Sequence, residues 1–265
     1  MILLTFLVGL CFSSVSTAPR EKRVLDGTPV PIGVHPFFVY VEDAESSCGG
    51  AIIGDRWVLT AAHCFNADDE VTIYAGINSP IVQKYRARKI SWYKKFDESD
   101  GLSDIILLET ARPIEFNAYV QPIDLAQEEI EIGQSVITMG YGVTEMAETS
   151  NKLLQLQGNV LSPEECNIAD SYERVSTICF QAQNMGNVCS GDSGGPLLAK
   201  DNVYTNVMFH CPWIEETTSS TVCCSRECRK RIEESRINEG KKILDELATL
   251  DKEAFDEFLK ILFES

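Results

Sequence analysis

The sequence predicts an all-β fold built from many short antiparallel strands, followed by a helical C-terminal tail. From Val24 to about Val207, short runs rich in Val, Ile, Tyr and Leu are broken by Gly, Pro, Asn and Asp. Short strands separated by turn residues are typical of antiparallel sandwiches and barrels. After about Cys223, charged residues dominate and the apolar residues recur at helical spacing.

Three apolar runs illustrate the strand pattern. Residues 37–41, 57–60 and 135–139 contain β-branched, aromatic and aliphatic side chains and are bounded by turn-forming residues. Each is therefore predicted to be a strand.

Two helices are predicted in the tail. Its apolar residues form two groups, and Asp251 between them is suited to cap the second helix. The apolar faces either dock on the β-domain or bind a partner. The two groups are Ile243, Leu244, Leu247 and Leu250, and Phe255, Phe258, Leu259, Leu262 and Phe263.

The N-terminal residues are interpreted as processing segments. Residues 1–18 contain an apolar run that is too short to span a membrane and that ends in small residues, which indicates a secretory signal peptide. The alternative, a buried strand, is disfavoured because polar residues follow at once. Residues 19–23 form a short basic pro-segment, and no other apolar run approaches the roughly 20 residues of a transmembrane helix. We therefore expect an extracellular protein with no membrane span.

The net charge and the cysteine content further restrict which class of protein this chain belongs to. A formal net charge of −17 argues against a nucleic-acid partner. It favours either solubility or attraction of cationic substrates. Ten cysteines in a secreted chain imply disulfides. Loss of Cys11 with the signal peptide leaves an odd number, so at least one thiol is free or pairs with another chain.

The stretch 191–196, Gly-Asp-Ser-Gly-Gly-Pro, is suited to hold a nucleophilic serine. Glycines permit backbone conformations that other residues avoid. The N–H groups of Gly191 and Ser193 can then point at one spot and stabilise an oxyanion. Alone, the stretch could also be a simple glycine-rich turn.

A serine nucleophile needs a base, and histidine is the side chain that supplies one near neutral pH. Of the three histidines, His35 and His210 lie in no recognisable motif, whereas His63 lies in Thr-Ala-Ala-His-Cys. Asp104 opens an apolar run, where a carboxylate needs a partner such as His63. A strand-capping aspartate is the alternative.

In identity and chain order, His63, Asp104 and Ser193 with their flanking residues resemble the trypsin/chymotrypsin family of secreted serine proteases. The resemblance implies two packed six-stranded β-barrels with the active site between them. It also implies a serine endopeptidase that acts on proteins or peptides, is open to protease inhibitors, and uses no cofactor or metal.

The resemblance assigns further roles. Cleavage after Arg23 would create an N-terminus at Val24, whose ammonium pairs with Asp192. A dibasic processing site is the alternative, and it would also release Val24. Asn187 stands at the floor of the primary specificity pocket, where its lack of charge argues against selection of Arg or Lys.

The implied disulfides are Cys48–Cys64 and Cys166–Cys179. Another family bridge is absent as a whole, because Val136 and Ala199 occupy its two positions.

The largest departure follows Pro196, where a stretch of roughly 20 residues is missing relative to the family. That stretch carries a barrel strand, a pocket wall and the partner of Cys189. We therefore expect an incomplete second barrel. Cys189 should be free or paired with one of four later cysteines, for which disulfides are preferred to zinc. Those four are Cys211, Cys223, Cys224 and Cys228.

The predicted organisation has four parts: signal peptide 1–18, pro-segment 19–23, peptidase domain 24–222 and helical extension 223–265. The predicted function is that of a secreted serine endopeptidase made as a zymogen. The alternative is a catalytically impaired, protease-like binding or regulatory protein.

Overall fold

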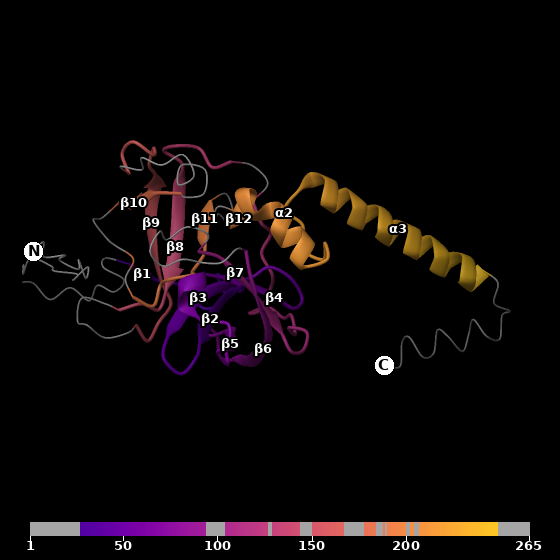
Figure 1. The fold of residues 1–265 in the computed structure, drawn as a ribbon, viewed down its shortest axis with the longest axis horizontal. Coiled ribbons are helices and arrows are strands. Elements are labelled where there is room, and N and C mark those ends of the chain that lie inside the picture. The colour runs from indigo at the N-terminus through magenta and orange to yellow at the C-terminus, as the bar shows by residue number, and fades with distance from the viewer. Residues whose placement is uncertain are drawn as a thin grey trace, which may run out of the picture.

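The computed structural model places two β-sheets side by side, with two helices after them (Figure 1). It describes residues 27–93, 104–126, 129–143, 150–166, 178–183, 188, 190–199, 202–203 and 207–248.

The first sheet is a closed six-stranded antiparallel barrel with strand order β2-β3-β4-β7-β6-β5. Its interior is filled by alternating aliphatic side chains such as Val39 and Val41 on β2 and Ile73 on β5, all fully buried. The strands are β2 (Phe38–Glu42), β3 (Ser47–Ile52), β4 (Trp57–Thr60), β5 (Thr72–Ala75), β6 (Gln83–Trp92) and β7 (Ile106–Thr110).

The second sheet has strand order β1-β9-β8-β11-β12, and β10 also pairs with β9. Among the described residues this sheet does not close on itself, which agrees with the expected incomplete second barrel. Strand β12 pairs antiparallel with β11, with Ala199 opposite Asn202. The strands are β1 (Thr28–Pro29), β8 (Ser135–Gly140), β9 (Leu154–Val160), β10 (Phe180–Ala182), β11 (Leu197–Ala199) and β12 (Asn202–Val203).

Helix α2 (Val207–Thr217) packs on both sheets, whereas α3 (Arg226–Ala248) extends away from them (Figure 1). Ile214 of α2 is fully buried in one apolar cluster with Leu59 of the barrel and Met139 of the second sheet. The predicted second tail helix, with its cap at Asp251, lies outside the described residues. In the part of the chain that the structure describes, neither helix combines the length and apolar character that crossing a bilayer requires.

Four disulfides join described cysteines, and the four late cysteines pair among themselves. Cys211 bonds to Cys224, and Cys223 bonds to Cys228. The alternative prediction, that Cys189 pairs with one of these four cysteines, is therefore wrong, because each of the four already has a partner. Cys189 itself lies outside the described residues. The pairs Cys48–Cys64 and Cys166–Cys179 are formed as the family resemblance implies.

Candidate active site

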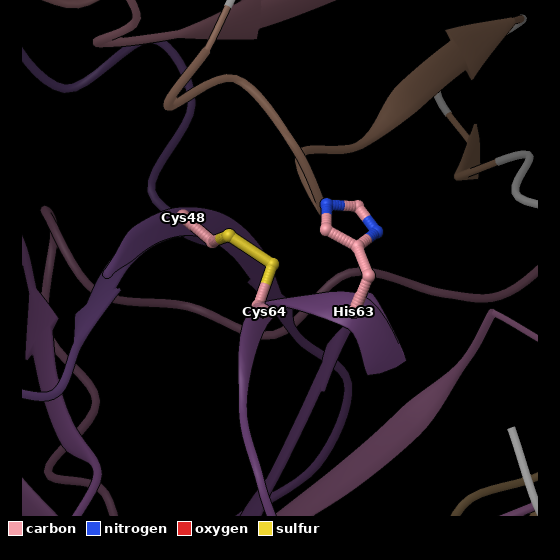
Figure 2. Close-up of side chains that lie close together, drawn as sticks. All are labelled: Cys48, His63 and Cys64. Atoms are coloured by element: carbon pink, nitrogen blue, oxygen red, sulfur yellow. A yellow bond between two sulfur atoms is a disulfide. The ribbon is translucent and has the colours of Figure 1, made fainter. Parts of the chain in front are cut away.

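His63 lies on the short 3-10 helix η1 (Ala62–Cys64), which directly follows β4. The next residue, Cys64, is joined to Cys48 of β3, so a disulfide fixes the turn that carries the imidazole (Figure 2). Ala61 and Ala62 are buried and small enough to let this turn pack against the barrel. The ring itself stays accessible, because 42% of the His63 side chain is exposed.

Asp104 lies just before β7 and contacts His63 twice. Its Oδ2 is 2.6 Å from Nδ1 of His63, and its Oδ1 accepts a hydrogen bond from the backbone N–H of His63 at 2.8 Å. Burial raises the pKa of Asp104, but the hydrogen bonds and charge of His63, together with the backbone N–H of Ala62, hold the pKa below its ordinary value. An ionised carboxylate at Nδ1 favours the imidazole tautomer that can accept a proton at Nε2.

Ser193 lies in a turn that two glycines make possible. Gly191 has φ of +93° and Gly194 has φ of +73°, conformations that side-chain-bearing residues avoid. The turn is closed by the N–H of Gly195, which donates to the carbonyl of Asp192 at 3.0 Å. The sequence-based expectation that Gly191 and Gly194 serve the backbone is consistent with this geometry.

The serine turn contacts the barrel beside the histidine segment. The carbonyl of Ser193 accepts a hydrogen bond from the N–H of Gly49 at 2.8 Å, next to the Cys48–Cys64 disulfide. The structure thus brings the loops that carry His63, Asp104 and Ser193 into one region between the two sheets. Thr60 and Gly49, which form this junction, lie in the sequence segments around His63 and Cys48, but the sequence assigned neither of them a role of its own. Only the folded contact between distant segments reveals them.

Asp192 is buried, with 8% of its surface exposed, and faces the end of β8. Its Oδ1 accepts a hydrogen bond from the N–H of Gly142 at 2.8 Å. A Cβ on Gly140 would lie 2.0 Å from Oδ1 of Asp192, so the glycine leaves space for the carboxylate. Arg23, Val24 and Asn187, the other residues expected to support activation or specificity, lie outside the described residues.

The surroundings of the other two histidines indicate structural roles. Nε2 of His35 is 3.1 Å from Oε1 of Gln155, and burial lowers the pKa of His35 more than this hydrogen bond raises it. His210 is buried with its ring edge-on to Tyr93, 4.4 Å between centroids.

A cavity of about 460 Å³ adjoins His63 on the side of the barrel loops. Asp43 and Glu45 contribute carboxylates to its lining, and Phe65 and Trp92 contribute apolar surface. The cavity beside His63 therefore has both acidic and apolar walls.

Three groups of side chains among the described residues have the proximity of metal ligands, but each contains a disulfide. In the group nearest the site, His63 lies beside Cys48 and Cys64 (Figure 2). A disulfide-bonded sulfur offers no thiolate, which is the form that binds metals. The other two groups combine Glu215 with Cys211 and Cys224, or with Cys223 and Cys228.

A family model described as Trypsin matches residues 24–220. The chain belongs to the trypsin family. It is a serine-type endopeptidase by that membership, and its predicted fold class is confirmed. Helix α3 begins after the matched segment ends.

Similar proteins agree with the trypsin-family assignment. Beta-fibrinogenase mucrofibrase-3 of Protobothrops mucrosquamatus is 31% identical over 246 residues, covering 81% of this chain and 95% of the relative. A trypsin of Simulium vittatum is 34% identical over 207 residues, covering 72% and 83%. The fold is similar to that of neuropsin, a serine protease expressed in the limbic system of mouse brain. The TM-score is 0.66 at 24% identity, over 73% of this chain and 99% of neuropsin.

Proposed function

We propose that this trypsin-family chain is a secreted protease that cleaves peptide bonds through Ser193, His63 and Asp104. The observation that carries the proposal is the double contact between Asp104 and His63, with the Ser193 turn hydrogen-bonded to the barrel beside them. Its substrates are proteins or peptides, because peptide-bond hydrolysis is the chemistry of the family.

In this mechanism Ser193 Oγ attacks the carbonyl carbon of the scissile bond while His63 Nε2 takes its proton. Asp104 holds the imidazole through Nδ1 and stabilises the imidazolium that forms. The N–H groups of Gly191 and Ser193 stabilise the negative oxygen of the tetrahedral intermediate. His63 then donates the proton to the leaving amine, and water hydrolyses the acyl-enzyme by the same steps in reverse roles.

Activation is proposed to follow cleavage after Arg23. The new ammonium group of Val24 would pair with the buried carboxylate of Asp192, one residue before the nucleophile. An ion pair at that depth would order the Gly191–Ser193 turn, since a buried charge that loses its partner costs roughly 3–5 kcal/mol. Asp192 is already buried beside Gly142, which supports this role.

Secretion is proposed from three features. Residues 1–18 have the pattern of a signal peptide. Four disulfides suit an oxidising compartment. Snake venom serine proteases are among the relatives, serpentokallikrein-2 of Protobothrops mucrosquamatus being one. The uncharged Asn187 leads us to expect no preference for Arg or Lys at the residue before the cleaved bond.

Hydrolysis of unfolded casein by three purified proteins tests this proposal. The wild type cleaved after Arg23 should hydrolyse casein. Ser193→Ala, processed in the same way, should lose about 10⁴–10⁶-fold in rate, because nucleophilic and general-base catalysis are lost together. Arg23→Gln should stay uncleaved and inactive.

Equal hydrolysis by the wild type and Ser193→Ala would contradict the nucleophile assignment. Full activity of uncleaved Arg23→Gln would contradict the zymogen mechanism alone. Absence of hydrolysis in processed wild type would favour a protease-like binding protein.

A further inference from the structure

The nucleophile turn and the histidine segment meet at the peptide groups of a single residue. Gly49 donates its N–H to the carbonyl of Ser193 at 2.8 Å. Its carbonyl accepts a hydrogen bond from Oγ1 of Thr60 at 2.7 Å. Gly49 thus has the serine turn on one side and the end of β4 on the other.

Thr60 is the last residue of β4 and lies three positions before His63. It is buried, with 4% of its surface exposed, so its hydroxyl bonds to Gly49 without competition from water. The same strand end therefore supplies both the imidazole and the hydroxyl that holds Gly49.

The serine turn also packs directly on Thr60. A Cβ on Gly194 would lie 2.2 Å from Oγ1 of Thr60 and 2.8 Å from the backbone nitrogen of Ala61. The backbone of Gly194 is therefore seated against the strand end as closely as a glycine allows. The side chain of Thr60 thus lies directly against the residue that follows the nucleophile.

We propose that Thr60 is a positioning residue that sets the separation of Ser193 and His63. Its hydroxyl binds the carbonyl of Gly49, in the peptide group that follows the Gly49 Cα, and the N–H of the peptide group that precedes this Cα donates to the carbonyl of Ser193. The two peptide groups share the Cα of Gly49, so the hydrogen bond from Thr60 restrains the residue whose N–H holds the Ser193 carbonyl. The inference rests on the proposed roles of Ser193 and His63.

The magnitude follows from the sensitivity of catalysis to geometry. A misplacement of about 1 Å between reacting groups costs about 10²-fold in rate. Loss of one hydrogen bond that restrains the turn should cause a smaller displacement. We therefore expect a fall of about 10-fold in kcat, with KM little changed, because the groove itself is not altered.

The experiment compares Thr60→Val, which keeps the shape and removes the hydroxyl, with Thr60→Ser, which keeps the hydroxyl. Processed proteins are compared in kcat, in KM and in the rate at which a fluorophosphonate probe labels them. Thr60→Val should lose about 10-fold in kcat and in labelling rate, and Thr60→Ser should restore most of both. Thr60→Ala, which is less crowded than valine, should show the same loss if Thr60→Val folds poorly.

Thr110→Val is the matched control. Thr110 on β7 is also fully buried, and its Oγ1 also donates to a backbone carbonyl, that of Arg112 at 2.8 Å. It should lose stability in thermal unfolding but keep the wild-type kcat and labelling rate per folded molecule.

Wild-type kcat and labelling rate in Thr60→Val would overturn the positioning role, as would equal losses in Thr60→Val and Thr110→Val. A wild type that the probe does not label would overturn the proposed function and, with it, this inference.

Discussion

Asp104 shows how one residue links the site to the stability of the fold. Its carboxylate accepts the backbone N–H of His63 and lies against Nδ1 of the same residue. These bonds stabilise the ionised form more than burial destabilises it, so the pKa is lowered from its ordinary value of 3.8. The stabilisation is therefore present above that value and is lost as the pH falls through the lowered pKa.

The lowered pKa of Asp104 leads to a first prediction about a single residue. Asp104→Asn should lower the free energy of unfolding most near pH 6, and the difference from the wild type should shrink as the pH falls below about 4. Denaturant titrations at a series of pH values measure it. The control is Asp68→Asn, which replaces an exposed carboxylate in the loop after η1. A difference between the wild type and Asp104→Asn that does not vary with pH would contradict the pKa direction.

The candidate triad could be predicted at this scale because each member lies in a local motif. His63, Asp104 and Ser193 are each recognisable from a few neighbouring residues. Thr60 and Gly49 could not be assigned a role in the same way. Their link joins two strands to a turn about 130 residues further along the chain, and it exists only when the two sheets pack.

At the scale of elements, the tail is joined to the protease body by a small disulfide-bonded unit. Cys211 of α2 bonds to Cys224, and Glu215 of the same helix accepts the N–H groups of Cys224 and Ser225 through its Oε1. Ser225 in turn caps α3, because its Oγ accepts the N–H of Cys228 at 3.1 Å. An ion pair between Arg229 and Asp124, 3.1 Å apart, adds a contact to the body.

The second prediction concerns these bridges. The double variant Cys211→Ser, Cys224→Ser removes a bridge between cysteines 13 residues apart. By loop-closure entropy it should lower the free energy of unfolding by about 3 kcal/mol. The double variant Cys223→Ser, Cys228→Ser removes a bridge between cysteines 5 residues apart and should lower the free energy of unfolding by about 2 kcal/mol. Denaturant unfolding of both variants gives the comparison. A larger loss for the second pair would show that loop length does not govern their contribution.

Sequence patterns predicted several strands closely but did not predict where helix α3 begins. The strand runs at 37–41, 57–60 and 135–139 correspond to β2, β4 and β8, shifted by a residue at most. The start of α3 at Arg226 could not be predicted from the hydrophobic period, since Ile232 and Ile237 are the only aliphatic residues between Arg226 and Ile243. The early turns of α3 are charged, and the capping at Ser225 and the Cys223–Cys228 bridge mark where the helix begins.

In the whole molecule, the candidate site lies between one closed barrel and a second sheet whose described strands stay open. The closed barrel supplies His63, Asp104 and the Gly49 peptide, whereas the open sheet supplies the Ser193 turn. A missing stretch after Pro196 was predicted to leave the second barrel incomplete, and the described strands of that sheet do not close. The packing of the two sheets around Ile214 could not be predicted from local patterns, because it combines residues from both sheets and α2.

Ser193 is proposed to be an activated nucleophile although the described strands of the second sheet do not close into a barrel. Labelling of the processed full-length chain by a fluorophosphonate probe, with the modified residue mapped by mass spectrometry, tests it most directly. Such a probe reacts with a serine that has a working base and oxyanion site, and it requires little of the substrate groove. We expect one adduct per molecule, on Ser193, and none in Ser193→Ala. An unlabelled wild type, or an adduct that persists in Ser193→Ala, would contradict it.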